Sequence, residues 1–210
     1  NEFGPNPKFV PTFKKEEENY KEAAKILKES GADLLVLEML LDVDHSKILL
    51  NAALETGLPV WVGLSCCDSK FDNSVIGRNF RAEKEKSLIY DENKYRDQPK
   101  YLPEDKIILL EDIIKSLTSL GGDVYGIMHT WFQDSIGGLK ILKNNWKGPI
   151  MFYPEIHKFD TNTHKAIITM TEEEFSNSIL ELIDDQIQIV GGCCGVNDKH
   201  LKRLIQSISE

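Results

Sequence analysis

The segment Gln188-Ile189-Val190-Gly191-Gly192-Cys193-Cys194-Gly195 combines the pattern of a buried strand with that of a metal site. Its short apolar run predicts a strand, and the glycines that follow allow the backbone to turn sharply and to approach a ligand closely. Adjacent cysteines do not easily bridge to each other, but both can point at one metal ion where a strand end turns. Cys193 and Cys194 are therefore candidate metal ligands. The alternative is that they are small buried hydrophobic residues.

The composition is that of an ordinary globular domain. The chain has 210 residues, of which 41% are hydrophobic and 28% are charged, so one domain with a large core is expected. The net charge of -9 argues against a nucleic-acid or anionic-membrane partner. No apolar run approaches the roughly 20 residues that a membrane-spanning helix needs. The four cysteines form two adjacent pairs rather than a disulfide framework, which favours a cytoplasmic location.

Helical and strand patterns alternate along the chain. Strands are predicted at residues 33–37, 58–65, 123–128, 150–153 and 188–190. Helices are predicted at residues 13–30, 44–56, 103–120, 135–144, 171–184 and 200–208, the third of them opened by Pro103. Residues 67–101 are polar and exceed the usual loop length, so they form a functional excursion, a lid or small elements of their own, and residues 154–168 are predicted to be a loop. The alternation predicts an α/β fold with a parallel sheet.

The ends of the predicted strands carry side chains suited to chemistry. Because sites in barrels of parallel strands lie at the carboxyl ends of the strands, these residues are expected on one rim: Glu38, Cys66, His129, Tyr153, Cys193 and Cys194. Two thiolates and the His129 imidazole would make a Cys2His zinc set with a fourth position left open. The alternative is that His129 is an ordinary rim histidine.

Glu38 and the first cysteine pair allow two interpretations each. Glu38 can bind the ammonium group of a substrate, or it can be a structural acid in a salt bridge. Cys66 and Cys67 can form a second metal half-site or a redox pair, but we expect one to pack and the other to face solvent. His157 and His164 lie in the predicted loop and can line the pocket, although histidines in exposed loops are usually only solvated.

Several of these segments resemble the homocysteine S-methyltransferases, a family that includes betaine–homocysteine methyltransferase and cobalamin-dependent methionine synthase. The most specific is Val190-Gly191-Gly192-Cys193-Cys194-Gly195, which matches the family's zinc motif. The other segments are Gly31 to Glu38, Val124 to Thr130, Ile150 to Pro154, and the Phe3-Gly4-Pro5 loop.

The resemblance implies a (β/α)8 TIM barrel in which three cysteines hold Zn²⁺ and the thiol of homocysteine accepts a methyl group, giving methionine. Zinc is needed because a free thiol is mostly protonated at neutral pH and coordination deprotonates it. The ligands carried over are His129, Cys193 and Cys194, and the substrate-binding residues are Glu38, Tyr153, Gly191 and Gly192. A small onium compound is the expected methyl donor.

Two departures from the family pattern shape these expectations. His129 replaces the first zinc cysteine, so the formal charge of the zinc site becomes zero rather than minus one, which favours thiol deprotonation but weakens the sulfur as a nucleophile. The likeness also covers only about strands 4–8, so residues 1–210 are expected to be the C-terminal part of one homocysteine-binding barrel. Five strands cannot close a barrel, so either the chain is a fragment of a longer gene product, or a second copy or another partner covers the two open sheet edges. The alternative function is a truncated or noncatalytic relative that binds a ligand or partner at the rim.

Overall fold

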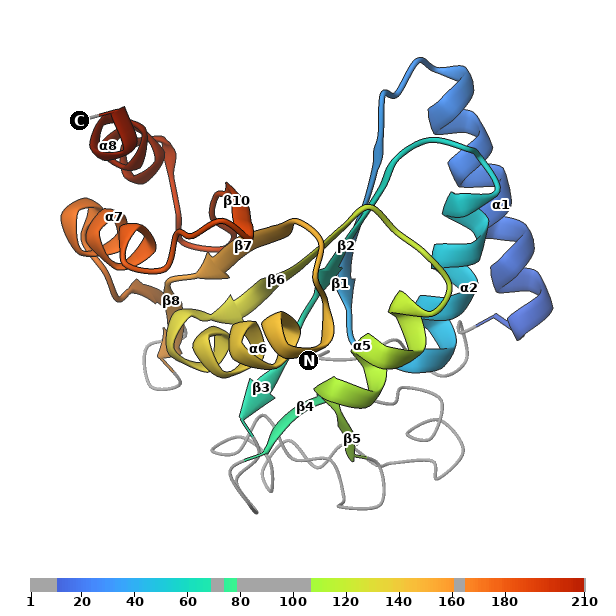
Figure 1. Ribbon diagram of the computed structural model, residues 1–210, viewed down its shortest axis with the longest axis horizontal. Coiled ribbons are helices and arrows are strands. Elements are labelled where there is room, and N and C mark those ends of the chain that lie inside the picture. The colour runs from blue at the N-terminus through green and yellow to red at the C-terminus, as the bar shows by residue number, and fades with distance from the viewer. Residues whose placement is uncertain (1–10, 69–73, 79–106, 161–164, 210) are drawn as a thin grey trace.

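A five-stranded parallel sheet forms the centre of the computed structural model, which describes residues 11–68, 74–78, 107–160 and 165–209 (Figure 1). The strands lie in chain order: β1 (Leu35–Leu40), β2 (Val60–Leu64), β6 (Val124–Trp131), β7 (Ile150–Glu155) and β10 (Ile187–Val190). Each neighbouring pair is parallel. The predicted α/β class and the five predicted strands are confirmed, and the arrangement is that of part of a TIM barrel.

The helices alternate with these strands as the sequence predicts. They are α1 (Phe13–Glu29), α2 (Val43–Leu54), α5 (Leu110–Thr118), α6 (Phe132–Asn145), α7 (Glu172–Leu180) and α8 (Asp198–Ser209). Side-chain oxygens cap three of them: Thr12 caps α1, Asp42 caps α2, and Thr171 forms a reciprocal capping box with Glu174 at α7. Among the described residues, no helix is long and apolar enough to cross a membrane.

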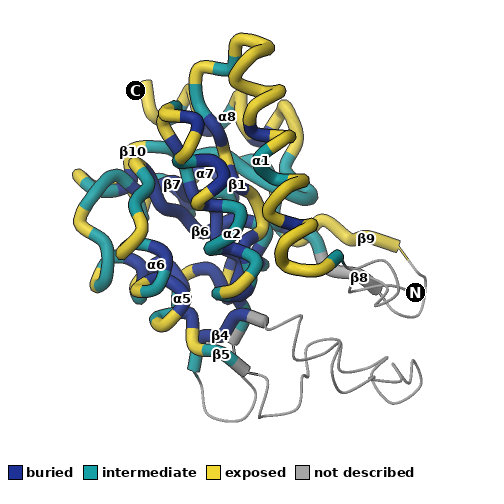
Figure 2. The backbone as a smooth tube through the Cα atoms, turned by 90° about the vertical axis from the view of Figure 1, so that its right-hand side faces the viewer, coloured by how far each residue is buried: buried dark blue, intermediate teal, exposed yellow. Residues whose placement is uncertain are grey.

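The two faces of the sheet differ in burial because side chains alternate along a strand. On the edge strand β1, Leu35 and Leu37 are buried in the main core, whereas Val36 and Glu38 are exposed. The main core also contains buried residues of all six helices, so the helices cover the face that Leu35 and Leu37 share. Figure 2 shows that buried residues concentrate in the central strands. The opposite face is the inner face of the barrel segment.

On the inner face, methionines fill the space above glycines of the neighbouring strand. A Cβ atom at Gly63 would collide with the Met128 side chain, and one at Gly126 would collide with Met151. Met128 and Met151 are both buried. The central strands therefore carry an apolar floor on this face, below their carboxyl ends.

The polar excursion contains small elements of its own, one of the three interpretations of residues 67–101. Strands β3 (Cys67–Asp68), β4 (Val75–Arg78) and β5 (Ile107–Leu109) form an antiparallel sheet. The start predicted for the third helix is wrong where it can be checked, because residues 107–109 pair with β4 and the helix begins at Leu110. Pro103 lies outside the described residues, as does the Phe3-Gly4-Pro5 segment.

The loop predicted at residues 154–168 is also wrong in part. Strand β7 continues to Glu155, and β8 (His157–Asp160) pairs with β9 (Lys165–Ile168) as an antiparallel hairpin. Pro154 is tolerated inside β7 because the pairing with β6 shifts its register there, between the Met128–Tyr153 and Trp131–Glu155 pairs, so no regular ladder bond needs its missing amide hydrogen. The Pro154 carbonyl oxygen accepts a hydrogen bond from the Cys193 amide. This extension brings Glu155 to the rim of the sheet.

Candidate metal centre

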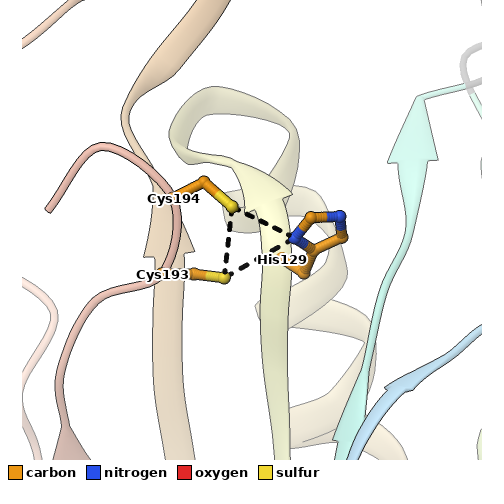
Figure 3. A group of neighbouring side chains, drawn as sticks. All are labelled: His129, Cys193 and Cys194. Atoms are coloured by element: carbon orange, nitrogen blue, oxygen red, sulfur yellow. Dashed lines mark hydrogen bonds between the residues drawn. The ribbon is translucent and has the colours of Figure 1, made fainter.

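Three predicted ligands converge at the carboxyl ends of the sheet strands. Cys193 and Cys194 follow β10, and His129 lies near the end of β6 (Figure 3). The His129 Nδ1 atom is 3.5 Å from Cys193 Sγ and 3.6 Å from Cys194 Sγ, and the two sulfurs are 3.8 Å apart. All three side chains are partly buried. Residues 64 positions apart in the chain thus present three donor atoms to one point.

The spacing of these atoms fits a tetrahedral zinc site. Bonds of about 2.3 Å to sulfur and about 2.0 Å to nitrogen, at tetrahedral angles, place two sulfurs about 3.8 Å apart and a sulfur and a nitrogen about 3.5 Å apart. The distances between the donor atoms of His129, Cys193 and Cys194 match these values. The residues present therefore fit Zn²⁺ even though an imidazole replaces one thiolate.

The backbone of His129 is held in an uncommon conformation. Its φ of 45° lies in the left-handed region, which is costly for a residue with a Cβ atom. The Ser65 hydroxyl, just beyond β2, lies 3.0 Å from the carbonyl oxygen of Met128 and 2.8 Å from that of His129. On the other side of His129, Thr130 Oγ1 donates to the Met128 carbonyl and accepts from the Cys66 amide. These contacts fix the turn that aims the imidazole at the cysteines.

The turn with the two cysteines is anchored on β7. The Cys193 amide donates to the Pro154 carbonyl at 3.0 Å, and the Ile156 amide donates to the Cys194 carbonyl at 2.9 Å. Gly195 closes the turn with a φ of 89°, a value that favours glycine. The positions of both sulfurs are therefore set by backbone pairing as well as by side-chain packing.

The protonation of the three side chains is coupled in the metal-free site. Contact with Cys193 raises the pKa of His129, and the same contact lowers the pKa of the Cys193 thiol. Burial, followed by the charge of Cys193, raises the pKa of Cys194 to about 11. The contact with His129 thus favours loss of the thiol proton from Cys193, while burial opposes its loss from Cys194. A divalent cation at this point would replace those protons.

The predicted substrate-binding residues lie around the same rim. Negative charge on Glu38 contributes to the raised pKa values of His129 and Tyr153, although burial is the larger cause for Tyr153. A Cβ atom at Gly191 would lie 2.8 Å from the Tyr153 ring, so this glycine is required for the close approach of the ring. A Cβ atom at Gly192 would collide with Val196 instead. Among the described residues, no hydrogen bond or salt bridge engages the exposed Glu38 carboxylate.

Two further residues lie at the centre: His157, for which the sequence allowed a place in the pocket lining, and Glu155, which the sequence analysis did not single out. Glu155 Oε2 lies 3.5 Å from His129 Nδ1 and 4.0 Å from His157 Nδ1. Glu155, His157 and Cys194 form a second group of possible metal ligands. The position of Glu155 just beyond a predicted strand could have identified it, since the carboxyl ends of parallel strands gather at one rim. His164 lies outside the described residues.

The other cysteine pair stays apart from the metal-ligand groups found among the described residues. Cys66 is buried and belongs to the main core, and a Cβ atom at Gly138 of α6 would lie 2.6 Å from its sulfur. Cys67 is half-buried. Packing of one cysteine is confirmed, while the second is only partly exposed.

The comparison with known families agrees with this geometry. A family model described as homocysteine S-methyltransferase matches residues 2–87 and 109–208. The chain belongs to the homocysteine S-methyltransferase family. A search of curated proteins gave no match.

Two solved structures share the fold of this family member. The apo form of the homocysteine methyltransferase MmuM from Escherichia coli is 15% identical, with a TM-score of 0.61 over 97% of this chain and 60% of that chain. For the metallated form the identity is 14% and the TM-score is 0.63, over 95% of this chain and 53% of that chain. The present chain thus spans about 60% of the length of the first and about half of the second. At this identity the likeness establishes the fold alone.

Proposed function

We propose that this chain takes part in zinc-dependent methyl transfer to the thiol of homocysteine, giving methionine from a small onium donor. The observation that carries the proposal is the match between the donor spacings of His129, Cys193 and Cys194 and the edges of a tetrahedral zinc site. A bound Zn²⁺ supplies the Lewis acidity that keeps a coordinated thiol deprotonated at neutral pH. Family membership supports the choice of homocysteine as the thiol.

Different residues around the metal centre bind the metal, bind the substrate ammonium group and form the walls of the site. His129, Cys193 and Cys194 hold the metal and thereby fix where the substrate sulfur lies. Glu38 is exposed and negatively charged, so it can receive the substrate ammonium group. The Tyr153 ring lies against the backbone of Gly191, and together they form a wall beside the sulfur position. Because Met128 and Met151 are buried on this face, the region below the rim is apolar.

Zinc analysis and calorimetry test the proposal directly. The full chain is dialysed against metal-free buffer after loading with Zn²⁺, and bound zinc is measured. Homocysteine is then titrated into the zinc-loaded and metal-free forms of the wild type and of His129→Ala. We expect about one zinc per chain, and homocysteine binding that needs zinc and is lost in His129→Ala. A correctly folded chain that retains no zinc would overturn the proposal.

Turnover separates the enzyme from the alternative function. Incubation of the zinc-loaded chain with homocysteine and either betaine or S-methylmethionine should produce methionine, detected by mass spectrometry. Cys67→Ser is the matched control for the ligand variants because it belongs to no metal-ligand group among the described residues. Zinc-dependent homocysteine binding without methionine formation would support a noncatalytic relative that binds its ligand at the rim. The predicted cytoplasmic location is part of the same proposal and stays a prediction.

A further inference from the structure

Two residues other than glycine adopt a left-handed backbone among the described residues, and both lie at the carboxyl ends of sheet strands. One is His129, and the other is Met39, whose φ is 60°. Met39 directly follows Glu38, the residue proposed to receive the substrate ammonium group. A left-handed conformation is costly for a residue with a Cβ atom, and such strain is concentrated at sites of binding and catalysis. The conformation of Met39 therefore points to a function for its side chain.

Met39 owes its conformation to a β-bulge. The pairing of β1 with β2 shifts its register between Leu37 and Leu40, so that Glu38 and Met39 together oppose the single residue Gly63. Two residues opposite one define a bulge, which bends the strand and redirects a side chain, and bulges are frequent beside active sites. This bulge lies at the carboxyl end of β1, on the rim that carries the metal centre.

The bulge also breaks the alternation of burial along β1. Leu37 and Leu40 are both buried in the main core, although residues three positions apart in a regular strand face opposite sides of the sheet. Glu38 and Met39 are both exposed, so they lie together on the side that the helices leave uncovered. Met39 keeps 46% of its surface exposed. An open apolar side chain thus lies beside the carboxylate proposed to bind ammonium.

The bound substrate must reach from Glu38 to the metal centre. Strand β2 lies between β1 and β6, and neighbouring strands are about 4.8 Å apart, so the backbones of β1 and β6 are separated by about 10 Å. An amino acid with its ammonium group at Glu38 and its sulfur at the metal therefore carries its carbon chain past the bulge. We infer that Met39 is a specificity-determining residue, whose flexible thioether side chain packs on the carbon chain of the bound thiol amino acid.

Met39 would select thiols by the length of that carbon chain. Cysteine has one methylene group fewer than homocysteine, so it cannot reach both Glu38 and the metal while it buries the same area against Met39. One methylene group in an apolar pocket changes discrimination by roughly 10- to 200-fold. The inference rests on the proposed function and adds the residue that distinguishes homocysteine from shorter thiols.

Calorimetry with two thiols tests this assignment. Homocysteine and cysteine are titrated into the zinc-loaded full chain of the wild type, Met39→Leu, Met39→Ala and Met39→Gly. We expect the alanine and glycine variants to bind homocysteine about tenfold more weakly and to lose most of the preference over cysteine, while the leucine variant stays within about threefold of the wild type. Ile205→Ala is the control, because it truncates an exposed apolar side chain on α8 and should leave both affinities unchanged.

Stability and zinc affinity separate this role from a merely structural one. In urea unfolding of the metal-free chain, Met39→Gly should have a higher midpoint than Met39→Ala, because glycine adopts the left-handed conformation without strain. Chelator competition should show wild-type zinc affinity in every Met39 variant, since Met39 supplies no ligand.

The outcomes distinguish the inference from the proposed function. Wild-type homocysteine affinity in Met39→Ala and Met39→Gly would overturn the inference and leave the proposed function standing, because the methionine would then belong only to the open sheet edge. Equal losses for homocysteine and cysteine would also overturn it, since Met39 would not select chain length. A fall in zinc affinity would move the effect to the metal centre and overturn it as well. A zinc-loaded wild type that binds neither thiol would overturn the proposed function, and the inference with it.

Discussion

The Ser65 hydroxyl lies 2.8 Å from the backbone carbonyl oxygen of His129 and 3.0 Å from that of Met128. Ser65 follows β2 and is buried, so a residue on one strand end holds the turn at the end of the next strand. The turn needs this support because His129 adopts a φ of 45°. Ser65 therefore acts on the proposed metal site through the backbone of His129, one of its candidate ligands.

Replacement of Ser65 by alanine should weaken both the fold and metal binding. The change leaves two carbonyl oxygens without this donor, so the free energy of unfolding should fall by about 1–3 kcal/mol. Because the imidazole is then less well aimed, zinc affinity should fall severalfold. Urea unfolding of the metal-free protein and chelator competition measure the two effects. Ser119→Ala is the control, since its exposed hydroxyl donates only within the end of α5. Reduced stability with unchanged zinc affinity would limit Ser65 to a structural role.

The left-handed conformation of His129 predicts an unusual order of stability. In the metal-free protein, His129→Gly should be more stable than His129→Ala by about 1 kcal/mol, because only alanine has a Cβ atom that opposes this conformation. Neither variant should bind zinc tightly. At exposed Lys140 inside α6 the order should reverse, with the glycine variant less stable by about 1 kcal/mol. Equal stabilities of the two His129 variants in urea unfolding would show that the backbone relaxes there.

Much of the fold could be predicted because helix and strand patterns are local. Alternating patterns placed all five strands of the parallel sheet, and short connections gave their direction. The hydrophobic residues of 107–109 were read as the start of a helix because their partner, β4, lies about 30 residues earlier. The hydrophobic pattern of a short segment does not reveal a strand partner that lies so far away in the sequence. The β8–β9 hairpin was missed because all four residues of β9 are exposed, so no alternation distinguishes it from a loop.

Of the candidate metal centre, the sequence could predict only the residues that lie at the ends of predicted strands. Cys193, Cys194 and His129 follow or end apolar runs and carry ligand side chains, so their convergence follows from a parallel sheet. Glu155 also lies at a strand end, but it was overlooked because Pro154 suggested that the strand had already ended. The support that Ser65 gives to the turn at His129 depends on a contact between two separate strands. Such contacts appear only when the strands are placed side by side.

Substitution of Gly191 by alanine should impair the binding of substrate more than that of metal. The added Cβ atom would lie 2.8–3.2 Å from three atoms of the Tyr153 ring, so the ring must move. The cysteine sulfurs are held by other backbone contacts, to Pro154 and Ile156. We therefore expect homocysteine affinity to fall about tenfold while zinc affinity changes less than twofold, an effect of about 1.4 kcal/mol on thiol binding alone. Calorimetry and chelator competition provide the two measurements. Equal losses in both would place the effect on the metal turn itself.

Removal of the metal should lower thermal stability by an amount set by mass action. A ligand that binds only the folded state at 100 times its dissociation constant adds about 2.7 kcal/mol to the free energy of unfolding. For a chain of this size that corresponds to a rise of about 5–10 °C in the unfolding temperature. Zinc should therefore raise the Tm of the wild type by this amount, and excess chelator should reverse the rise.

Serine variants of the cysteines connect that shift to the ligands. Cys193→Ser and Cys194→Ser each remove one of the two thiolates, so the rise in Tm on adding zinc should almost disappear, as measured by differential scanning calorimetry. Cys67→Ser should keep the full rise, because Cys67 lies in no metal-ligand group among the described residues. If Cys67→Ser lost the zinc effect and the other two variants kept it, the metal would bind at the first cysteine pair. The convergence of His129 with Cys193 and Cys194 would then serve packing alone.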